Sequence, residues 1–350
     1  MRDGNGRVMN HETPLSPRPL HHLSDVRHRV MTSRRLREHG VPASEIAARC
    51  HPGGPWQQLL PGVYLLHTGP ATSEERLHAA LMYTRARAQA IPAQAPRGDE
   101  APYGEAMITG LAALALHRFT SAPPLLRLEH IDVLVPHTRR LRATGFVRPV
   151  RTHSVPRPRL LTGVPVAPVP RAVADAVAHL TDPDRIRRLL TEAVRSGHCE
   201  ATRLHRELAR ARLLDRAPVA AVLDALLAEG RAAAEDRLYA MVAAAALPAP
   251  LWNVELLLPG GPSLGTVDAY WPDHGVAVEI DTRPRLRRDD PVHDEAARRH
   301  EHLEQLGLAV LAPTPRQLRE SPEQLADVVR STLLASAERA PGAYVVVLPR

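Results

Sequence analysis

Hydrophobic and polar residues follow a regular order of helices and strands only in the last third of the chain. Short runs of alternating residues are separated there by runs with helical spacing, and Pro and Gly cluster between them. The predicted elements are a helix over 232–246, strands over 252–258, 265–270 and 275–281, a helix over 292–306, a strand over 309–312, a helix over 322–337 and an edge strand over 344–348. This alternation predicts an α/β domain over residues 231–350.

Residues 25–69 show a different pattern. Two short helices, over 33–39 and 42–50, are predicted on either side of Gly40. Two apolar runs around Pro61-Gly62 then predict a hairpin. Helix, turn, helix and hairpin in this order are typical of a winged helix-turn-helix domain.

The remaining segments flank or connect these two regions. Residues 1–24 lack periodicity and are predicted to form a disordered tail. Residues 70–230 predict a middle α+β domain, mostly helical with a small sheet, in which 88–104 form a flexible insertion. Its helices are predicted over 73–87, 105–118, 171–180, 184–196, 202–213 and 218–229, and its strands over 131–135 and 164–166. The whole chain is therefore predicted to be an α+β multidomain protein.

Composition adds a chemical restriction and a preference for acidic partners. All 45 basic residues are arginine, so no step can use a lysine amine. The net charge of +7 favours nucleic acid or another anionic partner, although the codon usage of a G+C-rich genome would also enrich arginine. Aromatic residues make up 3% of the chain, so Leu, Val and Ala must form the cores.

Cysteine usage and the N-terminal residues bear on location. Cys50 and Cys199 form neither a disulfide framework nor a zinc pattern, which fits a reducing compartment. The N-terminal residues lack the apolar core of a signal peptide, and no apolar run is long enough to span a bilayer. We therefore expect a cytoplasmic protein without a membrane partner.

One stretch of the middle segment carries arginines and no acids. No Asp or Glu occurs over residues 133–174. The arginines in it are Arg139, Arg140, Arg142, Arg148, Arg151, Arg157, Arg159 and Arg171. This charge pattern predicts a surface that contacts DNA phosphates, with an ordinary solvated surface as the alternative.

Four carboxylates are candidates for chemistry. In a strand, Glu279 and Asp281 share one face, with Val278 and Ile280 on the other. If the strands on either side of the 272–275 turn pair, Asp268 comes close to Glu279. Glu235, on the preceding helix, then supplies a third oxygen ligand. Such a group is what Mg²⁺ requires, and the ion would activate a water against a phosphodiester.

This layout resembles the PD-(D/E)XK nucleases, particularly the small domains akin to the very-short-patch repair endonuclease. The resemblance implies a restriction-endonuclease-like fold, with metal ligands at Glu235, Asp268 and Glu279 and with Asp281 where these nucleases often carry lysine. It also implies a role in the site for Arg299, on the downstream helix. Two departures are the absence of any lysine and the sequence Thr282-Arg-Pro-Arg-Leu after the last acid, whose Arg283 and Arg285 are further candidate cations. A retained fold with a degraded site is therefore the alternative to an active nuclease.

The N-terminal segment resembles the winged-helix domain of AbiEi-type antitoxins of type IV toxin–antitoxin systems. The resemblance rests on 34–40, 44–49, Trp56 and Leu60-Pro-Gly-Val-Tyr, and the segments Gly110–His117 and 163–166 resemble the region that follows. It implies DNA binding and transcriptional regulation. The candidate DNA-binding residues in this segment are Arg34, Arg35, Ser44 and Arg49.

Three functions remain open at this point. The first is a DNA-binding regulator or antitoxin-like factor with a nuclease-derived C-terminal domain. The second is a Mg²⁺-dependent DNA endonuclease in which Asp268, Glu279, Asp281 and Arg299 are catalytic. The third is a non-catalytic regulator that binds a partner. DNA is the expected partner, a cognate toxin or self-association is an open alternative, and no cofactor is expected unless cleavage requires the metal.

Overall fold

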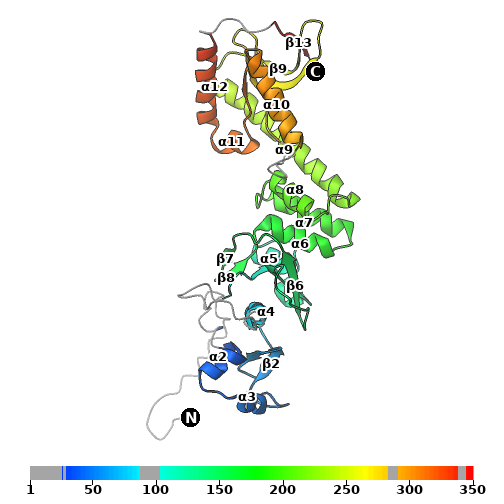
Figure 1. Cartoon of the computed structure of the whole chain (residues 1–350), viewed down its shortest axis with the longest axis vertical. Coiled ribbons are helices and arrows are strands. Elements are labelled where there is room, and N and C mark those ends of the chain that lie inside the picture. Colours follow the sequence, from blue (N-terminus) through cyan, green and yellow to red (C-terminus); the bar gives the residue numbers. More distant parts are fainter. Residues whose placement is uncertain (1–25, 27–28, 87–102, 283–290, 338–343, 350) are drawn as a thin grey trace, which may run out of the picture. The chain divides into compact units, whose positions relative to one another are not determined.

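Three β-sheets and eleven α-helices build the described part of the chain, in agreement with the predicted α+β class (Figure 1). The computed structural model describes residues 26, 29–86, 103–282, 291–337 and 344–349. The chain divides into unit 1, residues 1–176, and unit 2, residues 177–350. The predicted tail over 1–24 and most of the predicted insertion over 88–104 lie outside the described residues.

The first sheet of unit 1 has the strand order β1-β3-β2. β1 (Val30–Thr32) pairs antiparallel with β3 (Val63–Leu65), which pairs antiparallel with β2 (Gln57–Leu60). α2 (Ser33–Glu38) and α3 (Ala43–Arg49) lie between β1 and β2 in the chain. The predicted helices and hairpin are present. β1 was not predicted, because three residues are too few to show a periodicity.

Local interactions explain where these elements begin and end. Thr32 Oγ1 accepts a hydrogen bond from the backbone N–H of Arg35 at 3.2 Å and so caps α2. Gly62 takes a φ of +78° in the hairpin turn, a conformation that favours glycine. Leu36 of α2 and Ile46 of α3 pack with Met31 in a small core. Each short helix therefore depends on one buried side chain for its position.

The second sheet of unit 1 is larger than predicted, with the order β6-β5-β4-β8-β7. Its strands are β4 (Met107–Thr109), β5 (Ile131–Pro136), β6 (Val147–Thr152), β7 (Arg159–Leu161) and β8 (Val164–Val166). The helices of this region are α4 (Ser73–Ala86), α5 (Gly110–Leu116), the 3₁₀ helix η2 (Leu125–Arg127) and α6 (Val169–His179), which spans the division between the units.

Two predictions in this region were wrong. The single helix predicted over 105–118 is β4 followed by α5, because Met107, Ile108 and Thr109 are buried in the sheet and pair with β5. Tyr103, placed in the flexible insertion, is buried, and its hydroxyl lies 2.8 Å from His78 Nδ1. Tyr103 therefore belongs to the packed core and not to a flexible segment.

Unit 2 begins with α7 (Pro183–Arg195), α8 (Ala201–Arg210) and α9 (Ala217–Ala244). The helices predicted over 218–229 and 232–246 are one helix, α9, so the predicted domain boundary at 230/231 falls inside it. Gly230 costs a helix about 1 kcal/mol relative to Ala. The buried residues of α9 on both sides of it, against α7 and α8 and against the sheet, outweigh that cost.

The sheet of unit 2 has the order β12-β11-β10-β9-β13. Its strands are β9 (Leu251–Leu257), β10 (Ser263–Trp271), β11 (Val276–Val278), β12 (Ala309–Leu311) and β13 (Val346–Pro349). β10 pairs antiparallel with β9 and β11, and β11 pairs parallel with β12. The five strands lie at or near their predicted positions.

Two apolar cores hold helices against this sheet. One core joins Trp271 and Val278 to α9, α11 (Pro315–Glu320) and α12 (Pro322–Ala337). The other joins Tyr270 and Ala277 to Leu303 of α10 (Pro291–Gln305). Successive residues of β10 and β11 thus serve different cores, as the alternation of a strand requires. The candidate acidic residues lie where these two strands separate.

Candidate functional site

Asp268 of β10 and Glu279, which directly follows β11, lie at the same point of the sheet. Ala269 pairs with Val278, so extending the antiparallel register by one residue places Asp268 opposite Glu279. The two strands separate there, because the N–H of Ile280, the next one that faces β10, donates to the Asp268 side chain at 2.6 Å and not to the backbone of β10. The N–H of Glu279 continues the pairing with β12 by donating to Leu311 O at 2.9 Å. Asp268 is 4% exposed and Glu279 7% exposed. Two buried carboxylates this close require cations or hydrogen-bond donors around them.

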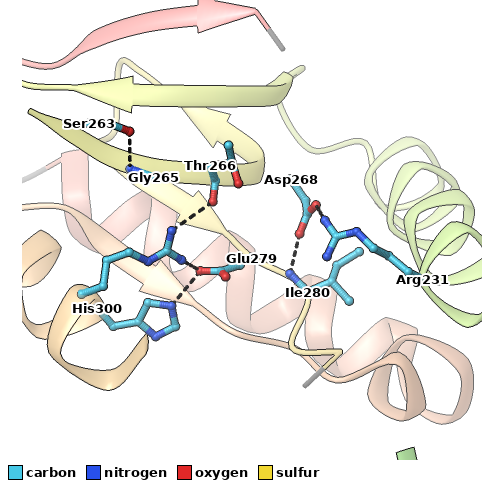
Figure 2. A network of polar contacts seen from close by, with 9 residues as sticks. Arg231, Ser263, Gly265, Thr266, Asp268, Glu279, Ile280 and His300 are labelled. Atoms are coloured by element: carbon cyan, nitrogen blue, oxygen red, sulfur yellow. Dashed lines mark hydrogen bonds and ion pairs between the residues drawn. The ribbon is translucent and has the colours of Figure 1, made fainter. Parts of the chain in front are cut away.

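Arg231 of α9 supplies the cation for Asp268. Its Nη2 donates to Asp268 Oδ1 at 2.5 Å, and the N–H of Ile280 donates to Oδ2 at 2.6 Å (Figure 2). Arg231 Nε also lies 2.8 Å from Oε1 of Glu235, one helical turn further along α9. One guanidinium therefore bridges two of the three predicted metal ligands.

Glu279 is held by two side chains of α10. Arg299 Nη2 donates to Glu279 Oε2. His300 Nε2 lies 2.8 Å from the same oxygen (Figure 2). Arg299 Nη1 also donates to the carbonyl oxygen of Thr266 at 3.4 Å. Burial lowers the pKa of the Arg299 guanidinium, yet an arginine pKa is high enough that the group remains charged.

Gly265 of β10 makes room for Arg299. Its φ is +100°, and a Cβ built there would overlap Nη1 of Arg299. The N–H of Gly265 donates to Ser263 Oγ at 3.1 Å, where the pairing with β9 shifts its register (Figure 2). The irregular strand and the missing side chain together let the guanidinium reach the backbone of β10.

The fourth predicted acid lies beside this group. Asp281 is half-buried, and its N–H donates to Pro313 O at 2.9 Å, so the backbone pairing of Glu279 continues through it. Ile280, between them, joins the core on the α9 side together with Val278, as the strand alternation predicted. Arg283 and Arg285 lie outside the described residues.

The predicted metal ligands form ion pairs instead of a cation-binding group. Among the residues that the structure describes, no three His, Cys, Asp or Glu side chains are gathered as metal ligands. Glu235 and Asp268 face Arg231, and Glu279 faces Arg299. A divalent ion would have to displace Arg231 to reach Asp268. As arranged, these residues do not fit a metal ion, and we derive no metal-dependent step from them.

Sequence reasoning missed three contributors to this site, namely Arg231, Gly265 and His300. Arg231 and Glu235 have the i,i+4 spacing of a helical ion pair, which was a usable signal. The contact of Arg231 with Asp268 was not predictable, because it joins residues 37 positions apart. Gly265 interrupts a β-strand pattern, which is a known sign of a bulge or a close approach.

The candidate DNA-binding residues of the first 70 residues differ in their surroundings. Ser44 is exposed on α3, and Arg35 is half-buried on α2. Arg34 pairs with Glu38 at 2.8 Å, with both side chains exposed. Arg49 pairs with Glu45, and its guanidinium carbon lies 4.6 Å from the centre of the Trp56 ring. Arg49 is therefore the most constrained of the four candidates.

The arginines of the acid-free stretch separate into two groups. Arg148 pairs with buried Asp132, Nε to Oδ1 at 2.5 Å, and Arg151 donates to backbone carbonyls. Arg140 and Arg142 are exposed, and Arg139 is half-buried. The first two arginines thus stabilise the second sheet of unit 1, whereas the other three form no ion pair with an acid of the described chain.

No protein-family model matches the sequence, and no curated protein matches it.

Within the described residues, no helix combines the length and the apolar character needed to cross a bilayer.

Proposed function

We propose that this protein binds double-stranded DNA through its N-terminal winged-helix-like region and that its C-terminal, nuclease-like domain does not cut DNA. The observation that carries the proposal is the arrangement of α2, α3 and the β2–β3 hairpin around one small core. In a helix-turn-helix, the second helix enters the major groove, and its exposed face contacts base edges. α3 takes the place of that helix.

The exposed face of α3 suits a groove. Ala43, Ser44, Ala47 and Ala48 are exposed, and Ile46 on the opposite side is buried. Small side chains let a helix backbone come close to the bases. A serine hydroxyl can bond to a base edge, and an alanine methyl can contact a thymine methyl. The neighbouring helix α2 carries Arg34 and Arg37, which are exposed and can reach phosphates.

The pairing of the candidate acids with arginines supports the proposal that the C-terminal domain does not cut DNA. The strand order and flanking helices of unit 2 agree with a PD-(D/E)XK ancestry, and Asp268 and Glu279 remain in place. Their charges, however, are balanced by Arg231 and Arg299. Arginine cannot serve as a base near neutral pH. A nuclease-derived domain whose acids are neutralised in this way fits a regulator or antitoxin-like factor that acts by binding DNA and not by cutting it.

One experiment separates this function from the alternatives. The full chain is titrated into labelled duplex DNA at about 50 mM salt and upwards, beside the double variant Ser44→Glu/Ala47→Glu. We expect binding that weakens steeply with salt and is lost in the variant, because two carboxylates on α3 repel the phosphates. The matched control is Ser331→Glu/Ala335→Glu, which makes the same exchanges on α12. Absence of binding at low salt contradicts the proposal and favours a partner-binding regulator.

Cleavage is tested on the same samples. Supercoiled plasmid is incubated with Mg²⁺ or Mn²⁺ and the wild-type chain, Asp268→Ala or Glu279→Ala. We expect no nicking above background from any of the three. Metal-dependent cutting by wild type that both variants abolish would instead support the endonuclease, which the adjacency of Asp268 and Glu279 favours. It would also show that DNA or metal displaces Arg231.

A further inference from the structure

The connection between β5 and β6, residues 137–146, runs along the edge of the second sheet of unit 1. β5 and β6 are parallel, with Ile131 opposite Val147 and Pro136 opposite Thr152. The chain therefore leaves at the end of one strand and returns to the beginning of the other, over about 17 Å for five residues of strand. Ten residues could reach about 33 Å if fully extended, so they cover that distance with length to spare. We call this segment the arginine loop.

The arginine loop is held through its backbone. Arg151 donates from Nε to the carbonyl oxygen of Arg139 at 3.1 Å and from Nη2 to that of Leu141 at 2.5 Å. Tyr83 of α4 donates its hydroxyl to the carbonyl oxygen of Arg142 at 3.2 Å. These bonds fix the path of the loop without using the side chains of its arginines.

Two of the arginine side chains in the loop are exposed. Leu141 is 4% exposed and packs inward, whereas Arg140 and Arg142 on either side of it are exposed. Within the described chain, neither of these two side chains has an ion-pair partner, and no acid occurs over residues 133–174. A fixed backbone thus presents two guanidinium groups two residues apart, beside half-buried Arg139.

The end of the arginine loop contacts the winged-helix-like region. Gly145 has a φ of +52°, and a Cβ built there would lie 3.3 Å from Leu60 Cδ2. Leu60 belongs to β2, a strand of the hairpin that takes the place of the wing. Phe146 is held in turn by Arg76, whose guanidinium carbon lies 4.9 Å from the ring centre. The loop and the hairpin therefore form neighbouring parts of one unit.

We propose that the arginine loop is a phosphate-binding extension of the wing, in which Arg140 and Arg142 contact the backbone of the same DNA duplex that α3 engages. This inference rests on the proposed function and adds a second contact to it. Arginine pairs with phosphate oxygens through two parallel N–H groups, and a held backbone lowers the entropy that the contact costs. Continuity with the hairpin and the density of charge on duplex DNA favour DNA over other anions.

The test uses a matched pair of double variants of the full chain. Arg140→Gln/Arg142→Gln removes two exposed charges from the arginine loop. Arg157→Gln/Arg159→Gln removes two exposed charges from the same acid-free stretch at β7, the opposite edge strand of the sheet. Binding to a labelled duplex is measured over a range of salt concentrations, and the slope of log K against log salt is compared with that of wild type.

We expect the loop variant to bind more weakly and with a slope that is less steep by about 1.8, the value for two lost phosphate contacts. The control should keep the wild-type slope. Equal slopes for the loop variant and wild type overturn the inference, as does an equal loss in both variants, which would indicate net charge alone. Either result would leave the proposed function intact, provided that the wild-type chain binds DNA and the α3 variant does not.

Two further outcomes are decisive. Failure of wild type to bind duplex DNA at low salt overturns both the proposed function and this inference. The second outcome comes from measuring the binding of the same variants to vesicles of anionic phospholipid. If the loop substitutions reduce binding to vesicles and leave duplex binding unchanged, the arginine loop is a membrane-surface contact, and the inference about DNA is wrong.

Discussion

The guanidinium of Arg299 lies where a side chain at Gly265 would begin. Because Arg299 in turn donates to Glu279, a glycine on β10 and a carboxylate after β11 depend on the same cation. The two positions are therefore linked, although the sequence separates each from Arg299 by at least 20 residues.

Replacement of Gly265 tests this link. We expect Gly265→Ala to lower the free energy of unfolding by about 1–3 kcal/mol, because alanine is strained at positive φ and its Cβ displaces Arg299. Gly260→Ala is the matched control: its φ is +64°, and a Cβ there meets nothing within 4 Å. Urea denaturation measures both. Equal losses would show that the backbone conformation accounts for the whole cost and that Arg299 contributes none.

Removal of Arg231 tests how the acidic site is balanced. We expect Arg231→Ala to destabilise the fold by about 1–3 kcal/mol, because it leaves buried Asp268 without its charged donor. Thermal unfolding of the variant should shift upward in Mn²⁺ relative to EDTA by more than that of wild type, since an ion that binds only the folded state stabilises it. Arg316→Ala, which breaks an exposed pair with Glu320, is the control and should change little.

An identical response of wild type and Arg231→Ala to Mn²⁺ would contradict the idea that Arg231 stands in the way of a cation. The measurement does not depend on DNA or on cleavage. It therefore tests the site independently of the proposed function.

Glu75 predicts a pH dependence of stability in unit 1. Burial raises its pKa, but the N–H of Thr72 and the side chains of His67 and Arg29 outweigh this effect, so the net pKa is lowered. A lowered folded pKa gives stability that is present above the unfolded value near 4.5 and is lost as the pH falls through the folded value. Glu75→Gln should therefore destabilise most above pH 4.5 and least in acid.

Asp175 should behave in the opposite way. Burial raises its pKa despite the pairing with Arg171 and the hydrogen bond from Thr109. Its ionisation therefore costs stability as the pH rises from the unfolded value of 3.8 through the folded one. Relative to wild type, Asp175→Asn should therefore become more stable as the pH rises from 3.8 through the folded pKa of Asp175. Chemical denaturation at several pH values measures both variants, and a shared sign of the pH trend would refute the assignment.

Arg151 is predicted to position the arginine loop. Trypsin cleaves after arginine, and we expect Arg151→Gln to accelerate cleavage after Arg140 and Arg142, because the loop loses two backbone hydrogen bonds. Arg157→Gln removes an equal charge at a residue outside the loop and should leave those rates unchanged. Mass spectrometry of the first fragments locates the cuts. Unchanged cleavage in Arg151→Gln would show that the loop is held by its other contacts.

The sequence predicted the sheet of unit 2 well because its signals are local. Alternation and the Pro-Gly turns around 259–262 and 272–275 determine β9, β10 and β11, and each turn is short. The predicted ends of helices were less reliable than the predicted strands. Gly230 suggested a helix end, but packing on both sides of it keeps α9 continuous. Met107–Thr109 resembled the first turn of a helix, and only burial against β5 makes it a strand.

The acids of the candidate site and one of their partners, Arg299, could be predicted, whereas Arg231 and His300 could not. The spacing of Asp268 and Glu279 around a turn is a local property of the chain. The identity of the cation beside each acid depends on how α9 and α10 pack on the sheet, which no periodicity encodes. The resemblance to the nucleases pointed to Arg299, which pairs with Glu279, whereas nothing in the sequence pointed to Arg231 beside Asp268.

The continuity of α9 has a mechanical consequence. Its 28 residues form a rod of about 42 Å, with Arg231 near the middle. The first half packs on α7 and α8, and the second half packs on the sheet that carries Asp268. Because no joint separates the halves, we expect a force that tilts the α7–α8 pair to be transmitted along the rod to Arg231, which pairs with Asp268. The electrostatic balance of the acidic edge would then depend on the position of α7 and α8, which pack on the first half of this helix.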